Sequence, residues 1–480
     1  TAGGPPKPRG RPWSVIADPM HCGIDELWFD RFRLVGPMRL ETPMRLRVRG
    51  PMEFSKVRLG LSSGKLMAGR ETIFDGLRLD VSATVHPLVP KSARRLALFR
   101  FLSGRFDISS RAASLFFLDA YFRKTPWLHF NDAAPGRAVL VLDHGKLQPG
   151  TSLEVTNKQV DMVILDRHLT GDGVIRGIVE TADGAPKSTL TARLHSFQIA
   201  PIDGTRPFAR GRNAHLVATS YSPDLANPFT DVHIVFDQPD AEILDLSFYN
   251  SLFPPASKFR LLSGSGTLRY HLEGSQAERS LHGRIDLDIH QASARYEDFE
   301  MRGGFSLRTA LRQASPREMP SDISGTRLDV HAADPRWTAS FTFPKARMRF
   351  SDPMAVNASV RLEMMDTRPL VAMFDALKGV PSWLQRMMTI PDIKGSVAVT
   401  ARQNDVDLTD LDVTGRGLHA LADLTLGKKS KEGVLYLRFH GFSVGIQLTG
   451  TGKDLKLIRP LRWFEIQRAQ RRQAAQQGRR

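Results

Sequence analysis

The segment Gly60-Leu-Ser-Ser-Gly64 has the Gly-x-Ser-x-Gly spacing of a nucleophile elbow, the turn on which many hydrolases present a catalytic serine. That elbow needs a strand before the serine and a helix after it, because the sharp turn lifts the hydroxyl above the sheet. Here Lys65-Leu-Met-Ala-Gly69 follows and soon meets another glycine, which favours a plain hairpin turn. We therefore expect no hydrolase chemistry at this serine.

Phosphate binding is the second kind of chemistry that the glycines suggest. The sequence contains neither a Gly-x-Gly-x-x-Gly nor a Walker-type loop. Ser263-Gly-Ser-Gly-Thr267 is rich in glycine, but it leads into a strand, whereas a phosphate cradle needs the N-terminus of a helix. These observations argue against a nucleotide-binding site.

Metal-ligating patterns are weak as well. The carboxylates of Asp405-Val-Asp-Leu-Thr-Asp-Leu-Asp412 and of Asp286-Leu-Asp288 lie two residues apart, hence on one strand face, where they could bind a hard cation weakly. A solvated face explains them better, because equivalent positions elsewhere hold Arg, His and Thr. The 14 histidines show no ligand spacing, and Asp143-His144-Gly145 is most simply a hairpin turn. Cys22 is the only cysteine, and we interpret it as a packed thiol. We predict no catalytic residue, no metal site and no cofactor.

The composition describes a folded, strongly basic chain. Apolar residues make up 41% of its 480 residues, which argues against wholesale disorder, and the formal charge is +17. Such a charge attracts phosphate, whether in nucleic acid or in an anionic lipid headgroup. No run approaches 18 uncharged apolar residues, so no span of a membrane is expected. The chain starts with Thr1 without a visible signal peptide, and we expect a form from which a targeting segment has been removed.

Apolar and polar residues alternate along most of the chain. The strands that this alternation predicts would carry any functional surface. Leu268, Tyr270 and Leu272 share one strand face, whereas Arg269 and His271 share the other. A period of two with one apolar face is typical of antiparallel strands with one wet side. The pattern continues through Val406, Leu408, Leu411 and Val413 after a slip of one residue. Roughly 25 strand-like runs joined by short turns predict a mainly β fold and disfavour a βαβ nucleotide-binding sheet.

Helix-like runs divide this pattern. They begin at Ala113, Ala241 and Pro369, so their starts lie 128 residues apart both times, which favours a repeated β module. The predicted regions are a flexible basic arm, an N-terminal β region with an amphipathic basic helix at 87–104, three β repeat units and a basic Arg/Gln tail. Their boundaries are 1–12, 13–110, 111–238, 239–365, 366–460 and 461–480. The tail could form a marginal helix or remain disordered.

Two groups of strands resemble a known family. The first comprises residues 264–274, 281–296 and 299–307, and the second comprises residues 393–400 and 411–420. These segments resemble the AsmA-like superfamily, which includes the TamB-type proteins of the bacterial envelope. In that family a strand pair of the form Gly-x-polar-apolar is followed by apolar-x-Gly-x-apolar, and this recurs. The resemblance covers roughly residues 230–450 and more faintly 26–230.

The resemblance implies a long, twisted, antiparallel repetitive sheet curled into an open groove with an apolar lining, as in bridge-like lipid-transfer proteins. It also implies the periplasm or cell envelope, with anchoring through a segment not in this chain. The implied partners are phospholipids or other anionic lipids and inner- or outer-membrane proteins, with no nucleic acid. The alternating apolar residues predicted to line the groove are Leu268, Tyr270, Leu272, Ile285, Leu287, Ile289, Val360, Leu362, Met364, Leu435, Leu437 and Phe439.

Three function classes remain open from the sequence. The leading expectation is a lipid-binding, lipid-transfer or outer-membrane biogenesis protein and not an enzyme. The second is a structural or adhesive β-repeat protein whose interior is filled by its own side chains. The third is a nucleic-acid binder, which the charge favours but the small number of tyrosines, 6, does not, because such surfaces stack bases on aromatic rings.

Overall fold

The computed structural model is mainly β, with 26 strands among the residues it describes. The described residues are 14–29, 32–47, 52–88, 95–114, 128–130, 133–164, 167–204, 206–221, 224–225, 231–252, 259–278, 280–296, 299–312, 321–332, 337–349, 355–368, 390–402, 405–427, 431–449 and 452–477. The pairings are antiparallel, as the alternation predicted, and the strands divide between two compact units. The predicted boundaries of the repeat units stay a prediction.

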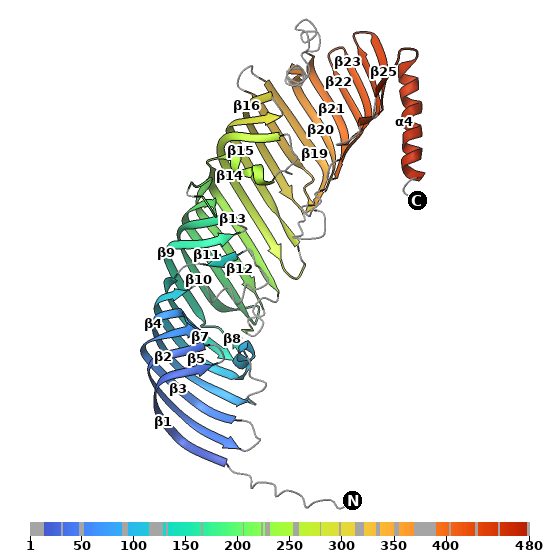
Figure 1. The fold of residues 1–480 in the computed structure, drawn as a ribbon. Coiled ribbons are helices and arrows are strands. Elements are labelled where there is room, and N and C mark those ends of the chain that lie inside the picture. The colour runs from blue at the N-terminus through green and yellow to red at the C-terminus, as the bar shows by residue number, and fades with distance from the viewer. Residues whose placement is uncertain are drawn as a thin grey trace, which may run out of the picture. The chain divides into compact units, whose positions relative to one another are not determined.

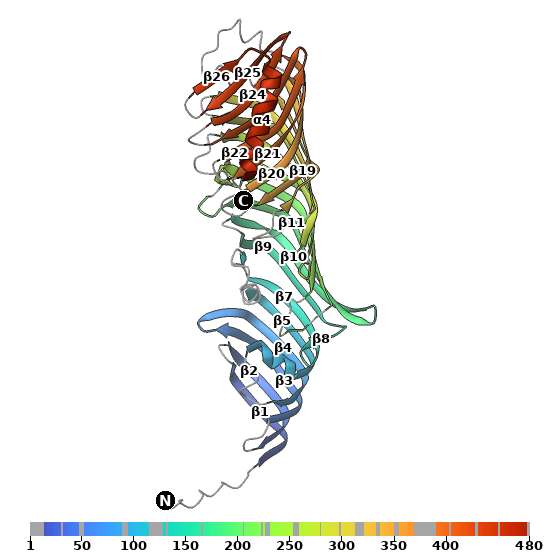
Figure 2. The same cartoon turned by 90° about the vertical axis from the view of Figure 1, so that its right-hand side faces the viewer.

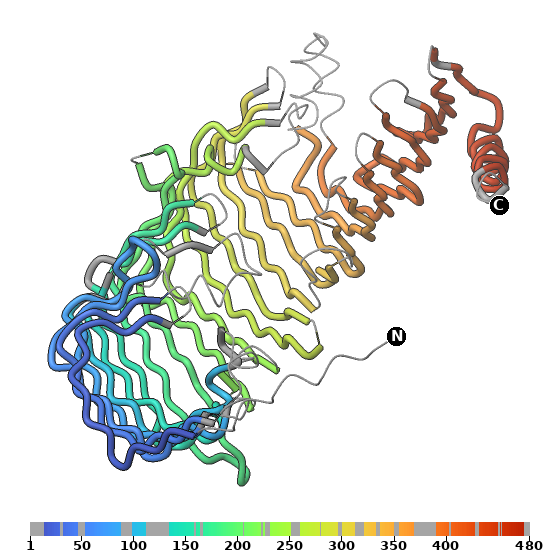
Figure 3. The backbone as a smooth tube through the Cα atoms, turned by 60° about the horizontal axis from the view of Figure 1, so that its bottom comes forward, coloured from blue at the N-terminus to red at the C-terminus, as the bar shows by residue number. Residues whose placement is uncertain are grey.

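The first unit comprises residues up to Pro207 together with Gly211–Phe236 and Ser275–Ala277. Its strands pair mostly with their neighbours in sequence, and they bend along their length (Figures 1 and 3). They are β1 (Ser14–Phe29), β2 (Phe32–Arg47), β3 (Met52–Ala68), β4 (Glu71–Leu88), β5 (Leu102–Ser114), β6 (Leu128–Phe130), β7 (Ala133–Asp143), β8 (Lys146–Leu147), β9 (Ser152–Ile164), β10 (Arg167–Ala182) and β11 (Ala185–Pro201), with the 3-10 helix η1 (Arg95–Phe101). The strands β12 (Ala209–Ser220) and β13 (Val232–Ile243) contribute residues to both units.

The second unit holds most of the chain after Asp237. Its strands are β14 (Phe259–Ser275), β15 (Ser280–Tyr296), β16 (Phe299–Leu311), β17 (Ser321–Asp322), β18 (Thr326–Ala332), β19 (Trp337–Arg349), β20 (Ala355–Asp366), β21 (Pro391–Arg402), β22 (Asp405–Gly415), β23 (Leu418–Leu426), β24 (Lys431–Phe439), β25 (Phe442–Thr449) and β26 (Gly452–Lys456). From β15 onward they form an antiparallel meander, in which β16 pairs with β18 and the short β17 pairs with β19 (Figure 1). The unit also contains the 3-10 helix η2 (Leu246–Leu252) and the helix α4 (Pro460–Gln477).

Several predicted helices turn out differently. The run that starts at Ala241 begins inside β13, and among its described residues Leu246–Leu252 form a 3-10 helix, η2. The run from Ala113 starts at the end of β5 and continues outside the described residues, where the run from Pro369 and the arm 1–12 also lie. Within 87–104, residues 87–88 belong to β4 and 102–104 to β5, so η1 is the described helical part. Strand pairing outweighs helical spacing at these positions.

The Gly60–Gly64 segment is neither an elbow nor the hairpin turn that we predicted. It lies inside β3, which continues to Ala68, and the register between β2 and β3 shifts there. A Cβ on Gly64 would stand 2.5 Å from the carbonyl oxygen of Val35, so glycine permits this close approach of the two strands. By contrast, Asp143-His144-Gly145 forms the predicted turn, with positive φ at His144 and Gly145.

The C-terminal tail resolves into α4, which packs against β24 and β25 (Figure 2). Phe464 is 1% exposed and packs with Val434 and Tyr436. The ring of Trp463 lies over Gly445, where a Cβ would stand 2.5 Å away. The helix is therefore held by an aromatic anchor and not by amphipathic spacing along its whole length.

Ion pairs fix the second half of α4. The predicted slip in β22 is a bulge between Leu408 and Leu411, and it turns Asp410 to a φ of 54°. Its N–H donates to Asp423 Oδ1 at 2.8 Å. Arg472 then pairs with both carboxylates, Nη2 to Asp410 at 2.6 Å and Nε to Asp423 at 3.3 Å, and Arg468 pairs with them from one turn earlier.

This arrangement predicts that acid releases α4. The hydrogen bond from Arg472 holds the pKa of Asp410 below its ordinary value, so the stabilisation is present at neutral pH and is lost as the pH falls through the folded-state pKa. Asp410→Asn should raise hydrogen exchange in α4 at neutral pH and flatten its acid dependence. Arg462→Ala, a change on the exposed side of the helix, is the control. Unchanged exchange in Asp410→Asn would contradict the role of these ion pairs.

Candidate functional site

In an antiparallel sheet, residues directly opposite one another point to the same face. Following the opposite partners from β15 to β25 therefore traces a row across one face of the second unit. The row is apolar at every step. It consists of Leu287, Leu307, Leu328, Phe341, Leu362, Gly395, Val413, Ala420, Leu437 and Val444.

A second row runs beside the first on the same face. It consists of Ile289, Phe305, Val330, Ala339, Met364 and Ile393, from β15 to β21. Ile289 and Ile393 are each 1% exposed, whereas most side chains of the first row are half-buried. We call the surface that carries both rows the apolar face.

The structure places all twelve predicted lining residues on the apolar face. Ile285, Val360, Leu435 and Phe439 alternate with or flank the two rows on their own strands. For β14, a Cβ on Gly266 would touch Ile289, and a Cβ on Gly283 would touch Leu272. Leu268, Tyr270 and Leu272 therefore share the face of Ile289. Whether lipid contacts them stays a prediction.

The first unit has a matching row. From β1 to β11 its members are Ile24, Met38, Leu61, Leu79, Ile108, Ala138, Leu153, Gly177 and Leu190. The list of lining residues predicted from the sequence contains no member of this row and only three of the ten members of the first row in the second unit, Leu287, Leu362 and Leu437. The alternation in each strand was the available signal, but the partner of each residue depends on bulges such as that between Val35 and Met38.

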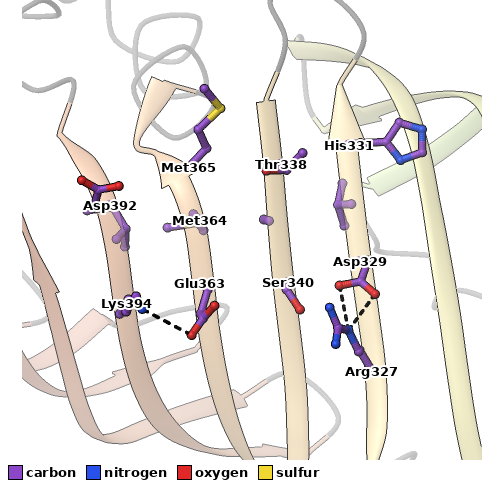
Figure 4. Close-up of a pocket in the computed structure, with 13 residues that line it drawn as sticks. Arg327, Asp329, His331, Thr338, Ser340, Glu363, Met364, Met365, Asp392 and Lys394 are labelled. Atoms are coloured by element: carbon purple, nitrogen blue, oxygen red, sulfur yellow. Dashed lines mark hydrogen bonds and ion pairs between the residues drawn. The ribbon is translucent and has the colours of Figure 1, made fainter.

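The opposite face of the second unit carries the charges. Arg327 Nε lies 2.8 Å from Asp329 Oδ2, and Lys394 Nζ lies 3.8 Å from Glu363 Oε1 (Figure 4). A hollow of about 500 Å³ lies among these side chains, between β18 and β21. The charges beside it are paired. Its lining also includes four members of the second row of the apolar face, Val330, Ala339, Met364 and Ile393.

The helices that the structure describes leave most of the apolar face uncovered. The anchors of α4, Val434 and Tyr436, alternate with Leu435 and Leu437, so α4 packs on the charged face. The η2 helix does lie on the apolar face, where Leu246 covers Gly264 and Asn250 bonds both backbone groups of Leu261. Beyond this end at β14, no described helix packs on the two rows.

A second arrangement brings a nucleophile near a base. Ser103 Oγ lies 2.8 Å from His86 Nε2, but the Ser103 hydroxyl donates its hydrogen bond to Asp143 Oδ1, 3.1 Å away. The N–H of His144 donates to the same Oγ at 2.9 Å. Hydrogen bonds from His144 and Ser103 lower the pKa of Asp143, which keeps it an acceptor. In a catalytic triad the carboxylate orients the histidine, and here it binds the serine. We interpret the cluster as support for the turn at His144.

Comparison of the chain with models of protein families, with curated proteins and with solved structures finds no match. Within the described residues, no group of three or more His, Cys, Asp or Glu side chains could hold a metal ion. Of the helices described, none combines the length and the apolar character needed to cross a membrane. The continuity of its two rows makes the apolar face the strongest candidate for a functional surface.

Tyr270 offers a direct test of how dry this face is. Burial raises the pKa of Tyr270 to about 12, from an ordinary value near 10. Because the folded state keeps the proton longer than the unfolded state, this residue's contribution to stability should fall between about pH 10 and 12. Absorbance at 295 nm should show a late-ionising tyrosine that Tyr270→Phe removes. Loss of an early-ionising tyrosine in that variant would place Tyr270 in water.

Proposed function

We propose that this protein binds the acyl chains of phospholipid-like molecules on its apolar face and carries them along it. In this proposal it is a lipid-transfer or outer-membrane biogenesis protein of the periplasm or cell envelope, and not an enzyme. The observation that carries the proposal is the unbroken apolar row from Leu287 to Val444, on the face opposite α4.

The energetics favour acyl chains as the occupant. Each methylene moved from water to apolar surroundings contributes ~0.8 kcal/mol, so a two-chain lipid lying on the rows would recover much of the cost of leaving a bilayer. The rows consist of Leu, Ile, Val, Phe, Met and Ala with glycine at Gly395, and they offer few hydrogen-bonding groups. Such a surface binds chains without choosing a headgroup.

The charges on the opposite face support the proposal that acyl chains bind to the apolar face alone. Ion pairs between residues two apart on one strand, such as Arg284 with Asp286 and Arg327 with Asp329, solvate that face. The excess positive charge of the chain favours anionic headgroups. A closed structural β-repeat would instead need a second layer over the apolar rows.

Site-specific photocross-linking tests where lipid lies. A photoreactive amino acid at Leu437, on the apolar face, should cross-link phospholipid in the purified protein. The same amino acid at Arg361, which is exposed on the charged face beside Leu362, should not. Equal labelling at the two positions, or none at Leu437, would favour the structural β-repeat alternative.

A charge placed in the row should stop transfer. Leu287→Asp puts a carboxylate opposite Leu307, and desolvating it should slow lipid transfer between vesicles by more than about tenfold. The control is Ser359→Asp, which adds the same charge at an exposed position opposite Lys345. Circular dichroism of both variants establishes that the sheet is retained. Normal transfer by a folded Leu287→Asp variant would count against carriage along this face.

A further inference from the structure

The second unit ends in a corner that exposes apolar side chains to an unusual degree. Phe442 is 63% exposed, Leu455 is 59%, Leu457 is 61% and Ile458 is 87%. Phe442 begins β25 after the turn from β24, Leu455 lies near the end of β26, and Leu457 and Ile458 belong to the connection from β26 to α4. Two neighbouring connections, the turn from β24 to β25 and the segment from β26 to α4, therefore carry or adjoin these residues. We call these four residues the apolar corner.

Register places the two connections at the same end of the sheet. Lys456 pairs with Gly445, and β26 runs antiparallel to β25, so Leu457 and Ile458 continue toward the end where β25 begins at Phe442. The gap from Gly445 to Phe442 is three residues, or about 10 Å of strand. The chain then turns back at Arg459, whose φ is 44°, and Trp463 fixes the turn by donating its N–H to the carbonyl of Arg459 at 3.1 Å.

Basic side chains surround the apolar corner. Arg438, Arg459 and Arg462 are exposed at this end, and Lys456 is nearby. The described acidic groups are Asp454, which already pairs with Lys456 at 3.0 Å, and Glu465. Exposed Leu, Ile and Phe ringed by Arg and Lys is the composition of interfacial membrane-binding surfaces, because the apolar groups enter the acyl boundary while the cations remain among phosphates.

We propose that the apolar corner docks on an anionic lipid bilayer. This inference rests on the proposed function, because it identifies where lipid would enter or leave the apolar face. Ile446 lies opposite both Leu435 of that face and Leu455 of the corner, so the apolar surface continues to the site of docking without a polar break. The charge complementarity selects a bilayer over an apolar protein partner.

Vesicle co-sedimentation tests the proposal. The probe is vesicles of phosphatidylglycerol and phosphatidylethanolamine, with phosphatidylcholine vesicles for comparison. The double variant Leu457→Asp/Ile458→Asp should bind the anionic vesicles about tenfold or more weakly than the unaltered protein. Ile202→Asp is the matched control, since Ile202 is an isoleucine 55% exposed in the first unit, and it should bind as the unaltered protein does.

Charge reversal separates the two contributions. Arg438→Glu/Arg462→Glu should weaken binding and reduce its dependence on salt, whereas the apolar double variant should weaken binding with the salt dependence retained. Binding of the apolar double variant equal to that of Ile202→Asp would overturn the proposal, because vesicle binding would then depend on the overall basic charge and not on the apolar corner.

Lipid carriage is measured separately with phospholipid presented in detergent micelles and the cross-linker at Leu437. Cross-linking that persists in the apolar double variant, together with lost vesicle binding, supports docking as a separate step. Cross-linking without any corner-dependent vesicle binding overturns docking and leaves carriage standing. Corner-dependent vesicle binding without cross-linking overturns carriage and leaves docking standing.

Discussion

Antiparallel register is the constraint on which the structure depends. Residues that lie opposite one another share a face of the sheet, so the apolar side of one strand fixes which side of the next strand is apolar. This relation holds across each described pairing from β15 to β25. A slip of one residue would move a strand's apolar set onto the charged face. The bulges at Leu408/Leu411 and Thr342/Lys345 absorb extra residues while the rows on either side stay in phase.

The same constraint places the charged groups. Arg284 and Asp286, or Arg327 and Asp329, lie two residues apart on one strand and pair within the charged face. Such exposed pairs contribute little to stability individually. Together they keep one face of the sheet hydrated. The helix α4 packs on this hydrated face through the buried ring of Phe464 and through ion pairs to a pair of carboxylates. One sheet thus presents an apolar face and a charged face.

The alternation of residues was sufficient to predict the antiparallel sheet, the apolar side of β14, β15, β20 and β24 and the slip in β22. It was not sufficient for long-range contacts. The docking of α4 depends on Asp410 and Asp423 meeting Arg468 and Arg472 from about fifty residues away, and no local pattern specifies that meeting. Helical spacing near Ala241 was misleading, because pairing extends β13 through Ile243. Neither residue alternation nor helical spacing indicates whether a ligand binds to the apolar face.

The uniformity of the apolar row has a kinetic consequence. A chain lying across it would meet closely similar neighbours at each step of about 4.8 Å, the spacing between strands. No strand of the row would then hold an acyl chain much more tightly than its neighbours, so a ligand would diffuse along a nearly level free-energy profile. The rate of its movement along the row would be set by the highest barrier on that profile. Gly395, which has no side chain and lies opposite Leu362 and Val413, interrupts this uniformity in the second unit.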